Sequence, residues 1–406
     1  MGGVHRFAVL AAVAVVFTGA ARYAGEFDWD HGRERAALVL AGLLAVPFLV
    51  HLGRRRSSPP VARSATWLLV CCCALLLARD AAVFLLTPDG PEPVDIAETT
   101  LAAARAMAEG HNPYLAAIDP HPDLLPERWR EFAGFKYLPL MPVVYMPLGL
   151  PFGIRGLYAT NLLLHACAAF LVFALGARLG SRETGWFAAI LVLLVPFATF
   201  ELLRQGATDL AALVPLLLAL LLGERRPLAA GLLVGLSIST KLLPGALFFA
   251  VCLPVRNDQR LVYALGAALG LLPALAFLAA APEPFVSNIV LFNALRPVDS
   301  TSWLYWAPSA ARPLAMGALA IGLLGAAGWA WSRRRDLLGR VALAASCIAA
   351  TLLLAPVCHR NYLLWWMPFM ALLSACAANG SHRRSHHGAH ERTRLLHPGR
   401  RTRFAA

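Results

Sequence analysis

The sequence predicts an all-α polytopic membrane protein with about 12 transmembrane crossings. The 406 residues are 59% hydrophobic and 15% charged, with a mean hydropathy of +0.62, whereas soluble domains carry about 25% charged residues. The apolar residues form runs of membrane-spanning length, and clusters of basic residues separate many of these runs. This composition excludes an ordinary cytosolic enzyme, a disordered chain and a secreted disulfide scaffold.

The apolar runs predict the individual helices, since a span needs about 20 apolar residues. The candidates are 7–21, 36–52, 65–86, 155–178, 185–200, 207–223, 227–253, 259–281, 313–331, 337–357 and 362–378. Segment 7–21 has the length of a signal peptide. Only His5 and Arg6 precede it and a poor cleavage site follows, so we expect a retained helix. The 8 cysteines lie in or at the end of such runs and are expected to be small packing residues.

The segment 227–253 is interrupted in the middle. Ser237-Ile238-Ser239-Thr240-Lys241 divides it, and Leu242-Leu243-Pro244-Gly245 follows. A lysine near the centre of one straight span is costly. We therefore expect a helical hairpin whose tip, at Lys241, lets the ammonium reach water.

The net charge of +13 predicts the orientation. The basic loops and tail contain Arg54-Arg55-Arg56, Arg178 with Arg182, Arg225-Arg226, Arg256 with Arg260, Arg333-Arg334-Arg335 and residues 379–406. With the hairpin counted as two crossings, all of them fall on one side, which the positive-inside rule makes cytoplasmic. We expect one transmembrane domain over 1–378 with both termini inside. We expect 379–406 to be a disordered basic tail on anionic lipid, with metal binding by its histidines as the alternative.

The predicted outer face contains 22–35, 87–154, 201–206, 282–312, the turn 358–361 and the hairpin tip. The large loop 87–154 predicts an amphipathic helix from Ile96 to Glu109, with Ala97, Leu101, Ala104 and Ala108 on one face. Gly110-His111-Asn112-Pro113 ends that helix. The proline-rich stretch 138–151 is too broken for a span and favours a re-entrant or interfacial element.

Polar residues collect at helix ends on this outer face. They are Asp95, Glu98, Lys136, Tyr137, Arg204, Gln205, Asp209, Lys241, His359 and Arg360. Ionisable groups at membrane depth are functional candidates, and their convergence from separate elements favours a substrate site. Simpler interpretations stay open, because Asp95 is also a favoured N-cap. Lys241, Arg204 and Arg360 could instead extend their charged ends to the membrane interface. His359 could be a residue at that interface whose hydrogen bonds are satisfied.

Two further groups have structural interpretations. Trp303, Trp306, Trp365 and Trp366 are expected in an aromatic belt at the membrane interface, although aromatic faces also stack on sugar rings. Arg79 and Asp80 lie within 65–86 and predict an intramembrane ion pair.

Several motifs, taken in order, resemble those of a known enzyme family. They are Val94-Asp95-Ile96 before Gly110-His111-Asn112-Pro113-Tyr114; Phe135-Lys136-Tyr137-Leu138-Pro139-Leu140 before Pro147-Leu148-Gly149; Arg204-Gln205-Gly206; Gly231 to Pro244 with Lys241; and Pro356 to Trp365 with His359. They resemble the polyprenol-phosphate-sugar-dependent glycosyltransferases of the GT-C superfamily, with glycosyltransferase family 87, the alpha-mannosyltransferase group, as the best match. Leu138 replaces the family's first proline, and Arg204-Gln205-Gly206 has its Gly-Gln order altered.

The resemblance implies a GT-C fold and transfer of a hexose, for which we expect mannose, from a polyprenyl-phosphate donor to a glycolipid or envelope glycan. A carboxylate takes the proton of the acceptor hydroxyl, and cations stabilise the leaving phosphate. Asp95 is the implied base. The implied phosphate ligands are His359, Lys241, Arg360 and Arg204, and the implied sugar or acceptor ligands are Glu98, Tyr114, Tyr137 and Gln205.

We expect no metal, no cofactor and no nucleic-acid partner, and an active site outside the cytoplasmic membrane. The alternative is a polytopic transporter or lipid flippase, which also uses broken helices and buried charges. The outer loop 87–154 favours the enzyme, because the acid Asp95 lies near its start and only one segment is broken.

Overall fold

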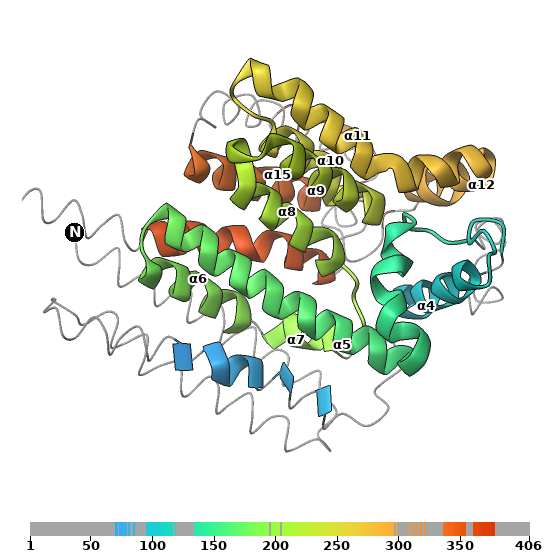
Figure 1. Cartoon of the computed structure of the whole chain (residues 1–406), viewed down its shortest axis with the longest axis horizontal. Coiled ribbons are helices and arrows are strands. Elements are labelled where there is room, and N and C mark those ends of the chain that lie inside the picture. Colours follow the sequence, from blue (N-terminus) through green and yellow to red (C-terminus); the bar gives the residue numbers. More distant parts are fainter. Residues whose placement is uncertain are drawn as a thin grey trace, which may run out of the picture.

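The computed structural model describes residues 95–116, 134–194, 196–203, 205–295, 336–354 and 360–377, with residue 118 and scattered positions in 70–85 and 298–321. Within this part of the chain every regular element is a helix (Figure 1). The predicted spans 7–21 and 36–52, most of 313–331 and the tail 379–406 lie outside the described residues.

The helices follow the predicted apolar runs closely. They are α4 (Asp95–Ala108), α5 (Leu140–Leu179), α6 (Arg182–Leu194), α7 (Pro196–Leu203), α8 (Leu210–Leu222), α9 (Pro227–Thr240), α10 (Leu242–Cys252), α11 (Asn257–Ala280), α12 (Pro282–Val286), α13 (Phe292–Leu295), α15 (Leu337–Leu354) and a final helix Leu363–Ala377. Short 3-10 turns at Gly223–Arg225 and Arg360–Tyr362 (η7) and a π-helical turn at Ser287–Leu291 (η4) connect some of them.

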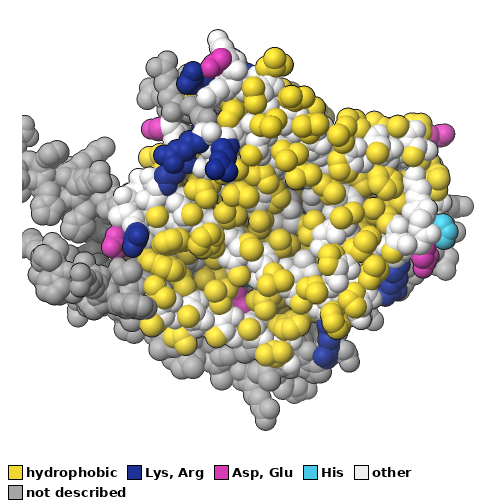
Figure 2. Space-filling view, in the orientation of Figure 1, with side chains coloured by type: hydrophobic (Ala, Val, Ile, Leu, Met, Phe, Trp, Pro, Cys, Tyr) yellow, Lys and Arg dark blue, Asp and Glu magenta, His cyan; other side chains and the backbone are white. Residues whose placement is uncertain are grey.

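The apolar helices fit a membrane protein. Among the described residues, α5 and α11 are long and apolar enough to cross a bilayer, and several shorter helices are equally apolar. Exposed leucines such as Leu261, Leu265 and Leu272 cover the outer side of α11, and Figure 2 shows hydrophobic side chains over much of this face. The count of 12 crossings stays a prediction.

Close helix packing depends on small residues. A Cβ on Gly231 would lie 2.0 Å from the Tyr263 carbonyl oxygen, and one on Gly270 would lie 2.4 Å from that of Leu232. These glycines let the backbones of α9 and α11 approach as membrane helices with small interface residues do. The pair is therefore a rigid support for the break at the end of α9.

Two segments depart from the expected boundaries. The stretch 138–151 is helical from Leu140 onward and forms the first part of α5, which bends sharply at Gly153, where φ is +58°. The bend brings Gly156 against the backbone of Leu148, where no Cβ would fit. The predicted span 185–200 overlaps the described helices α6 and α7, which together extend from Arg182 to Leu203 on either side of residue 195.

The break at Lys241 is confirmed. α9 ends at Thr240, Lys241 has an extended backbone (φ −149°, ψ +123°), and α10 begins at Leu242. The predicted helix after residue 95 is also present, and Gly110 follows its end with a φ of +81°. On that helix Ala97, Leu101 and Ala104 are buried as expected, whereas Ala108 is exposed.

Basic side chains gather at one end of the helix bundle. Arg178 at the end of α5 donates to the Leu221 carbonyl of α8 at 2.5 Å, and it lies within electrostatic reach of Arg225 and Arg340. Figure 2 shows Lys and Arg side chains together at the upper left. In Figure 1 the helices α4 and α12 lie at the opposite end.

Candidate active site

The loop between α7 and α8 brings together elements that were predicted for the outer face. Gly206 has a φ of +74°, and a Cβ there would lie 2.7 Å from the Cβ of Ala97 in α4. A glycine is needed at this position both for the backbone conformation and for the close approach. The contact places the first turn of α4, which begins with Asp95, against the loop that leads to Asp209.

A buried asparagine fixes this loop. The Asn161 side chain of α5 is fully buried, and its Nδ2 donates to the carbonyl oxygens of Leu202 at 2.7 Å and Ala207 at 3.0 Å. Its Oδ1 accepts from the Tyr145 hydroxyl at 2.7 Å. Since buried polar groups need partners, this network holds the end of α7 and the start of α8 in one arrangement.

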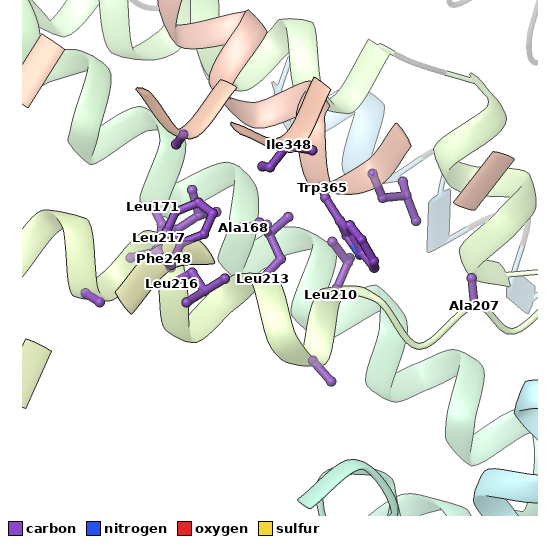
Figure 3. Close-up of a cluster of buried hydrophobic side chains, with 14 of the residues drawn as sticks. Ala168, Leu171, Ala207, Leu210, Leu213, Leu216, Leu217, Phe248, Ile348 and Trp365 are labelled. Atoms are coloured by element: carbon purple, nitrogen blue, oxygen red, sulfur yellow. The ribbon is translucent and has the colours of Figure 1, made fainter. Parts of the chain in front are cut away.

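Asp209 is the centre of the site. It precedes α8 and is fully buried. Its Oδ1 accepts from Lys241 Nζ at 2.6 Å and from Trp365 Nε1 at 2.7 Å, and its Oδ2 accepts from Asn361 Nδ2 at 2.6 Å. Three donors from two segments that are distant in sequence, one at Lys241 and one at residues 361–365, therefore meet on one carboxylate. Figure 3 shows Trp365 beside Leu210, the residue after Asp209.

The Lys241 ammonium is enclosed by aromatic rings. Its Nζ lies 5.0 Å from the ring centroid of Trp365, 5.2 Å from that of Tyr362 and 5.6 Å from that of Tyr137. Such faces attract cations, most strongly where water is excluded. Lys241 is only 8% exposed. The expectation that its ammonium reaches water is therefore wrong, because the Asp209 carboxylate replaces the water.

Trp365 is also placed differently from the expected interfacial belt. It is 4% exposed, its indole N–H is bonded to Asp209, and its ring stacks on Tyr362 with centroids 4.9 Å apart. Trp366 is half-buried against the same core. Trp303 and Trp306 lie outside the described residues.

The Tyr114 side chain orients the loop segment that contains Tyr137. Tyr114 is 3% exposed and packs against Phe135, Phe277 and Phe285. Its hydroxyl donates to the Tyr137 carbonyl oxygen at 2.7 Å. Burial raises the pKa of Tyr114 well above its ordinary value, so the hydroxyl keeps its proton and remains a donor.

Asp95 lies in a more open environment. It is exposed at the first position of α4, and its Oδ1 accepts from the Ile96 backbone N–H at 2.8 Å. An N-cap side chain usually accepts from the second or third helical N–H instead. Glu98, one turn further on, is half-buried. The cap and base interpretations of Asp95 are not exclusive, and this geometry leaves both open.

The remaining predicted residues are placed only in part. Gln205 is half-buried in the loop before Asp209. Arg360 begins the turn η7, but its side chain, like Arg204 and His359 altogether, lies outside the described residues. Asn361 and Tyr362 of the same turn contact Asp209 and Lys241, respectively.

A different buried pair is found on α5. His165 Nδ1 lies 3.2 Å from Asp80 Oδ2, and both side chains are almost fully buried. The expected partner of Asp80, Arg79, lies outside the described residues. The described residues contain no cluster of three or more His, Cys, Asp and Glu side chains arranged to hold a metal ion.

Comparison with known proteins identifies the family. The family model of glycosyltransferase family 87 matches residues 135–356, which is more than half of the chain. The chain belongs to glycosyltransferase family 87. No curated protein and no solved structure matches it.

The residues of the candidate site lie partly inside and partly outside the range matched by family 87. Tyr137, Asp209 and Lys241 lie inside the matched range, whereas Asp95 and the turn at Arg360–Tyr362 lie on either side of it. Family 87 is a glycosyltransferase family, so this protein is a transferase, and the alternative of a transporter gains no support.

Sequence reasoning missed the central role of Asp209 in this family 87 protein, and with it Asn361, Tyr362 and Trp365. A signal was present, because Asp209 and Lys241 both lie in or beside apolar segments of a chain with few charges. A buried charge requires a partner, so the two could have been paired. Asn361 and Trp365 gave no comparable signal, because neutral donors are common at helix ends.

Proposed function

We propose that this family 87 protein transfers a hexose, with mannose as the first candidate, from a polyprenyl-phosphate donor to a glycolipid or envelope glycan. The reaction would take place at the outer side of the cytoplasmic membrane. The observation that carries the proposal is the buried ammonium of Lys241. It is held by Asp209 and by the rings of Tyr137, Tyr362 and Trp365. Of these residues Lys241, Asp209 and Tyr137 lie within the family-matched range.

The chemistry needs a base and an anion site. The acceptor oxygen attacks the anomeric carbon, its proton passes to the Asp95 carboxylate, and the bond between that carbon and the phosphate oxygen breaks. The polyprenyl phosphate leaves with the electron pair and gains one negative charge. Direct displacement inverts the anomeric centre. Proton removal by a positioned base contributes about 10²–10⁴-fold to the rate.

Lys241 suits the leaving phosphate because charge develops there during the reaction. Cationic groups aimed at developing charge in a water-poor site stabilise the transition state more than they would in water. His359, Arg360 and Arg204 are assigned to the same phosphate by the family resemblance. Two of them directly precede Asn361, whose side chain contacts Asp209.

The Asp95 carboxylate is accessible, as a base for an incoming acceptor must be. Its Oδ1 is bonded to Ile96, and Oδ2 has no hydrogen-bond partner among the described residues. The Ala97–Gly206 contact connects its helix to the Asp209 loop. Glu98, Tyr137 and Gln205 are assigned to sugar or acceptor. Tyr114 would act on the same substrate through its hydrogen bond to Tyr137.

The proposed topology is a GT-C fold of about 12 crossings with both termini and the tail 379–406 in the cytoplasm. The gathering of Arg178, Arg225 and Arg340 at one end supports it, because basic residues concentrate on the cytoplasmic side. α4 lies at the other end, where the active site would face outward.

The test is incubation of purified protein with a panel of radiolabelled polyprenyl-phosphate sugars and a membrane lipid extract. We expect a labelled product from one donor, with mannose tried first. Uptake of the donor into vesicles without any covalent product would favour the transporter and contradict the proposal.

A further inference from the structure

We propose that Asp209 is a positioning residue of the donor-phosphate site, which places the Lys241 ammonium and couples it to the turn at Arg360–Tyr362. This inference rests on the proposed function of Lys241. It assigns a role to a carboxylate that makes no contact with the acceptor and takes no proton in the reaction.

The hydrogen bonds of Asp209 exclude it as the base. Both carboxylate oxygens are occupied by N–H donors, with Lys241 and Trp365 on Oδ1 and Asn361 on Oδ2. The residue has no exposed surface. An acceptor hydroxyl could reach this enclosed carboxylate only by displacing one of these donors. Asp209 therefore acts on the reaction through the groups it holds.

The Lys241 ammonium depends on Asp209 for its position. An ammonium has three N–H donors, and within the described part of the chain Asp209 is its hydrogen-bond acceptor. The rings of Tyr137, Tyr362 and Trp365 attract the charge but specify no hydrogen-bond direction. One N–H is thus anchored by the carboxylate, which leaves the other two N–H donors of the ammonium for phosphate oxygens.

The same carboxylate connects segments that are distant in sequence. Lys241 is 32 positions from Asp209, whereas Asn361 and Trp365 are 152 and 156 positions away. Asn361 directly follows His359-Arg360, the two residues assigned to the same phosphate. Loss of the carboxylate would loosen Lys241 and this turn together, so its effect on catalysis should exceed that of an ordinary buried hydrogen bond.

The primary test is the kinetics of Asp209→Asn. Asparagine has nearly the same shape, but it removes the negative charge opposite Lys241. Its amide also replaces one of the two oxygens that accept from Lys241, Asn361 and Trp365 with an NH2 group. We expect kcat to fall at least 10-fold while KM for the donor changes less than about 3-fold. The reason is that the interaction with Lys241 strengthens as charge develops on the leaving phosphate. Asp209→Glu, which keeps the charge, should recover part of kcat.

Asp80→Asn is the matched control, because Asp80 is another fully buried carboxylate, with His165 as its partner. Its kcat per folded molecule should equal that of the wild type. A purely structural role of Asp209 would give the two variants the same behaviour, with fewer folded molecules but unchanged kcat and KM. That outcome would overturn the inference.

A double-mutant cycle with Lys241→Met separates positioning from folding. If Asp209 acts through Lys241 as well as through the turn, then Asp209→Asn costs clearly less in kcat when Lys241→Met is already present than it costs in the wild type. The cost that remains reports the contribution of the turn at Arg360–Tyr362. An equal cost in both backgrounds would show that Asp209 acts independently of Lys241 and would overturn the inference.

A binding measurement distinguishes failure of this inference from failure of the proposed function. Polyprenyl monophosphate, the leaving group, should raise the thermal midpoint of the wild-type protein but raise that of Asp209→Asn much less. If no sugar is transferred but this difference is found, the proposed transfer fails and the anion site stands. If sugar is transferred and Asp209→Asn keeps both kcat and the phosphate-induced shift, the inference fails and the function stands. If neither transfer nor a shift is seen in the wild type, both are overturned.

Discussion

Asp95 and Asp209 both lie at the start of a helix, and both benefit from the positive end of the helix dipole, but their surroundings are opposite. Asp95 is exposed and bonds to the next residue in the chain, Ile96. Asp209 is fully buried and takes hydrogen bonds from Lys241, Asn361 and Trp365. One carboxylate is placed by local sequence, and the other by the tertiary fold.

The difference separates two tasks that one acid could not perform. A base must meet its substrate and exchange a proton, which requires access. A positioning carboxylate must keep its partners in one geometry, which requires enclosure and saturated hydrogen bonds. We therefore expect changes around Asp209 to affect stability as well as activity, and changes at Asp95 to affect activity alone.

The largest effect on stability is expected for Lys241→Met. This substitution leaves the Asp209 carboxylate buried without its counter-charge, which costs about 3–5 kcal/mol for a buried ion pair. Chemical denaturation in detergent measures the loss. The double variant with Asp209→Asn should recover much of it. An unchanged denaturation midpoint for Lys241→Met would contradict the buried pair.

The next effect is expected for Asn161→Leu, which removes the amide that holds the Asp209 loop. The Leu202 and Ala207 carbonyls and the Tyr145 hydroxyl lose their partner, at a cost of about 1–3 kcal/mol for each buried group left unsatisfied. Asn257→Leu, at an exposed position, is the control and should stay within about 0.5 kcal/mol. Equal denaturation midpoints for the two variants would exclude this role of Asn161.

A smaller effect is expected for Trp365→Phe. The ring facing Lys241 is kept, but the N–H bonded to Asp209 is lost, and hydrogen bonds to charged groups contribute about 1.5–3 kcal/mol. Trp366→Phe, at a half-buried position on the same helix, should cost less. Denaturation midpoints measure the difference. A lower midpoint for Trp366→Phe than for Trp365→Phe would contradict the stabilising role of the Trp365–Asp209 hydrogen bond.

The smallest effect is expected for Tyr114→Phe, which removes one neutral hydrogen bond to the Tyr137 carbonyl, for about 1 kcal/mol. Tyr263→Phe removes a similar bond to the Phe249 carbonyl at 3.0 Å and should cost about the same. Steady-state kinetics then distinguish them. Only Tyr114→Phe should raise the KM for substrate, because only Tyr114 positions Tyr137.

Local features of this fold could be predicted from sequence. The cost of a buried charge predicted the break at Lys241. Residue spacing together with Gly110 predicted a helix from Ile96 to Glu109, and the structure has it at Asp95–Ala108. The kink at Gly153 could not be predicted from the run 138–151, because it depends on how the first part of α5 packs. The placement of 138–151 and 185–200 relative to the membrane stays a prediction.

The partners of the buried charges could not be predicted in the same way. Trp365 lies in an apolar run that fits a membrane interface equally well, and only the fold brings its N–H to Asp209. The Lys241 ammonium was expected in water because no sequence pattern indicates that a residue 32 positions away supplies a carboxylate. Asp95, in contrast, has no distant partner to predict among the described residues, and the motif resemblance was sufficient to propose it as the base.

The central claim is tested most directly by the transfer rate of Asp95→Asn, measured with its thermal midpoint and with saturating polyprenyl-phosphate sugar. The account predicts a loss of at least about 100-fold in turnover, the size of a base contribution, with a midpoint equal to that of the wild type because the carboxylate is exposed. Wild-type turnover by Asp95→Asn would contradict the assignment of Asp95 as the base.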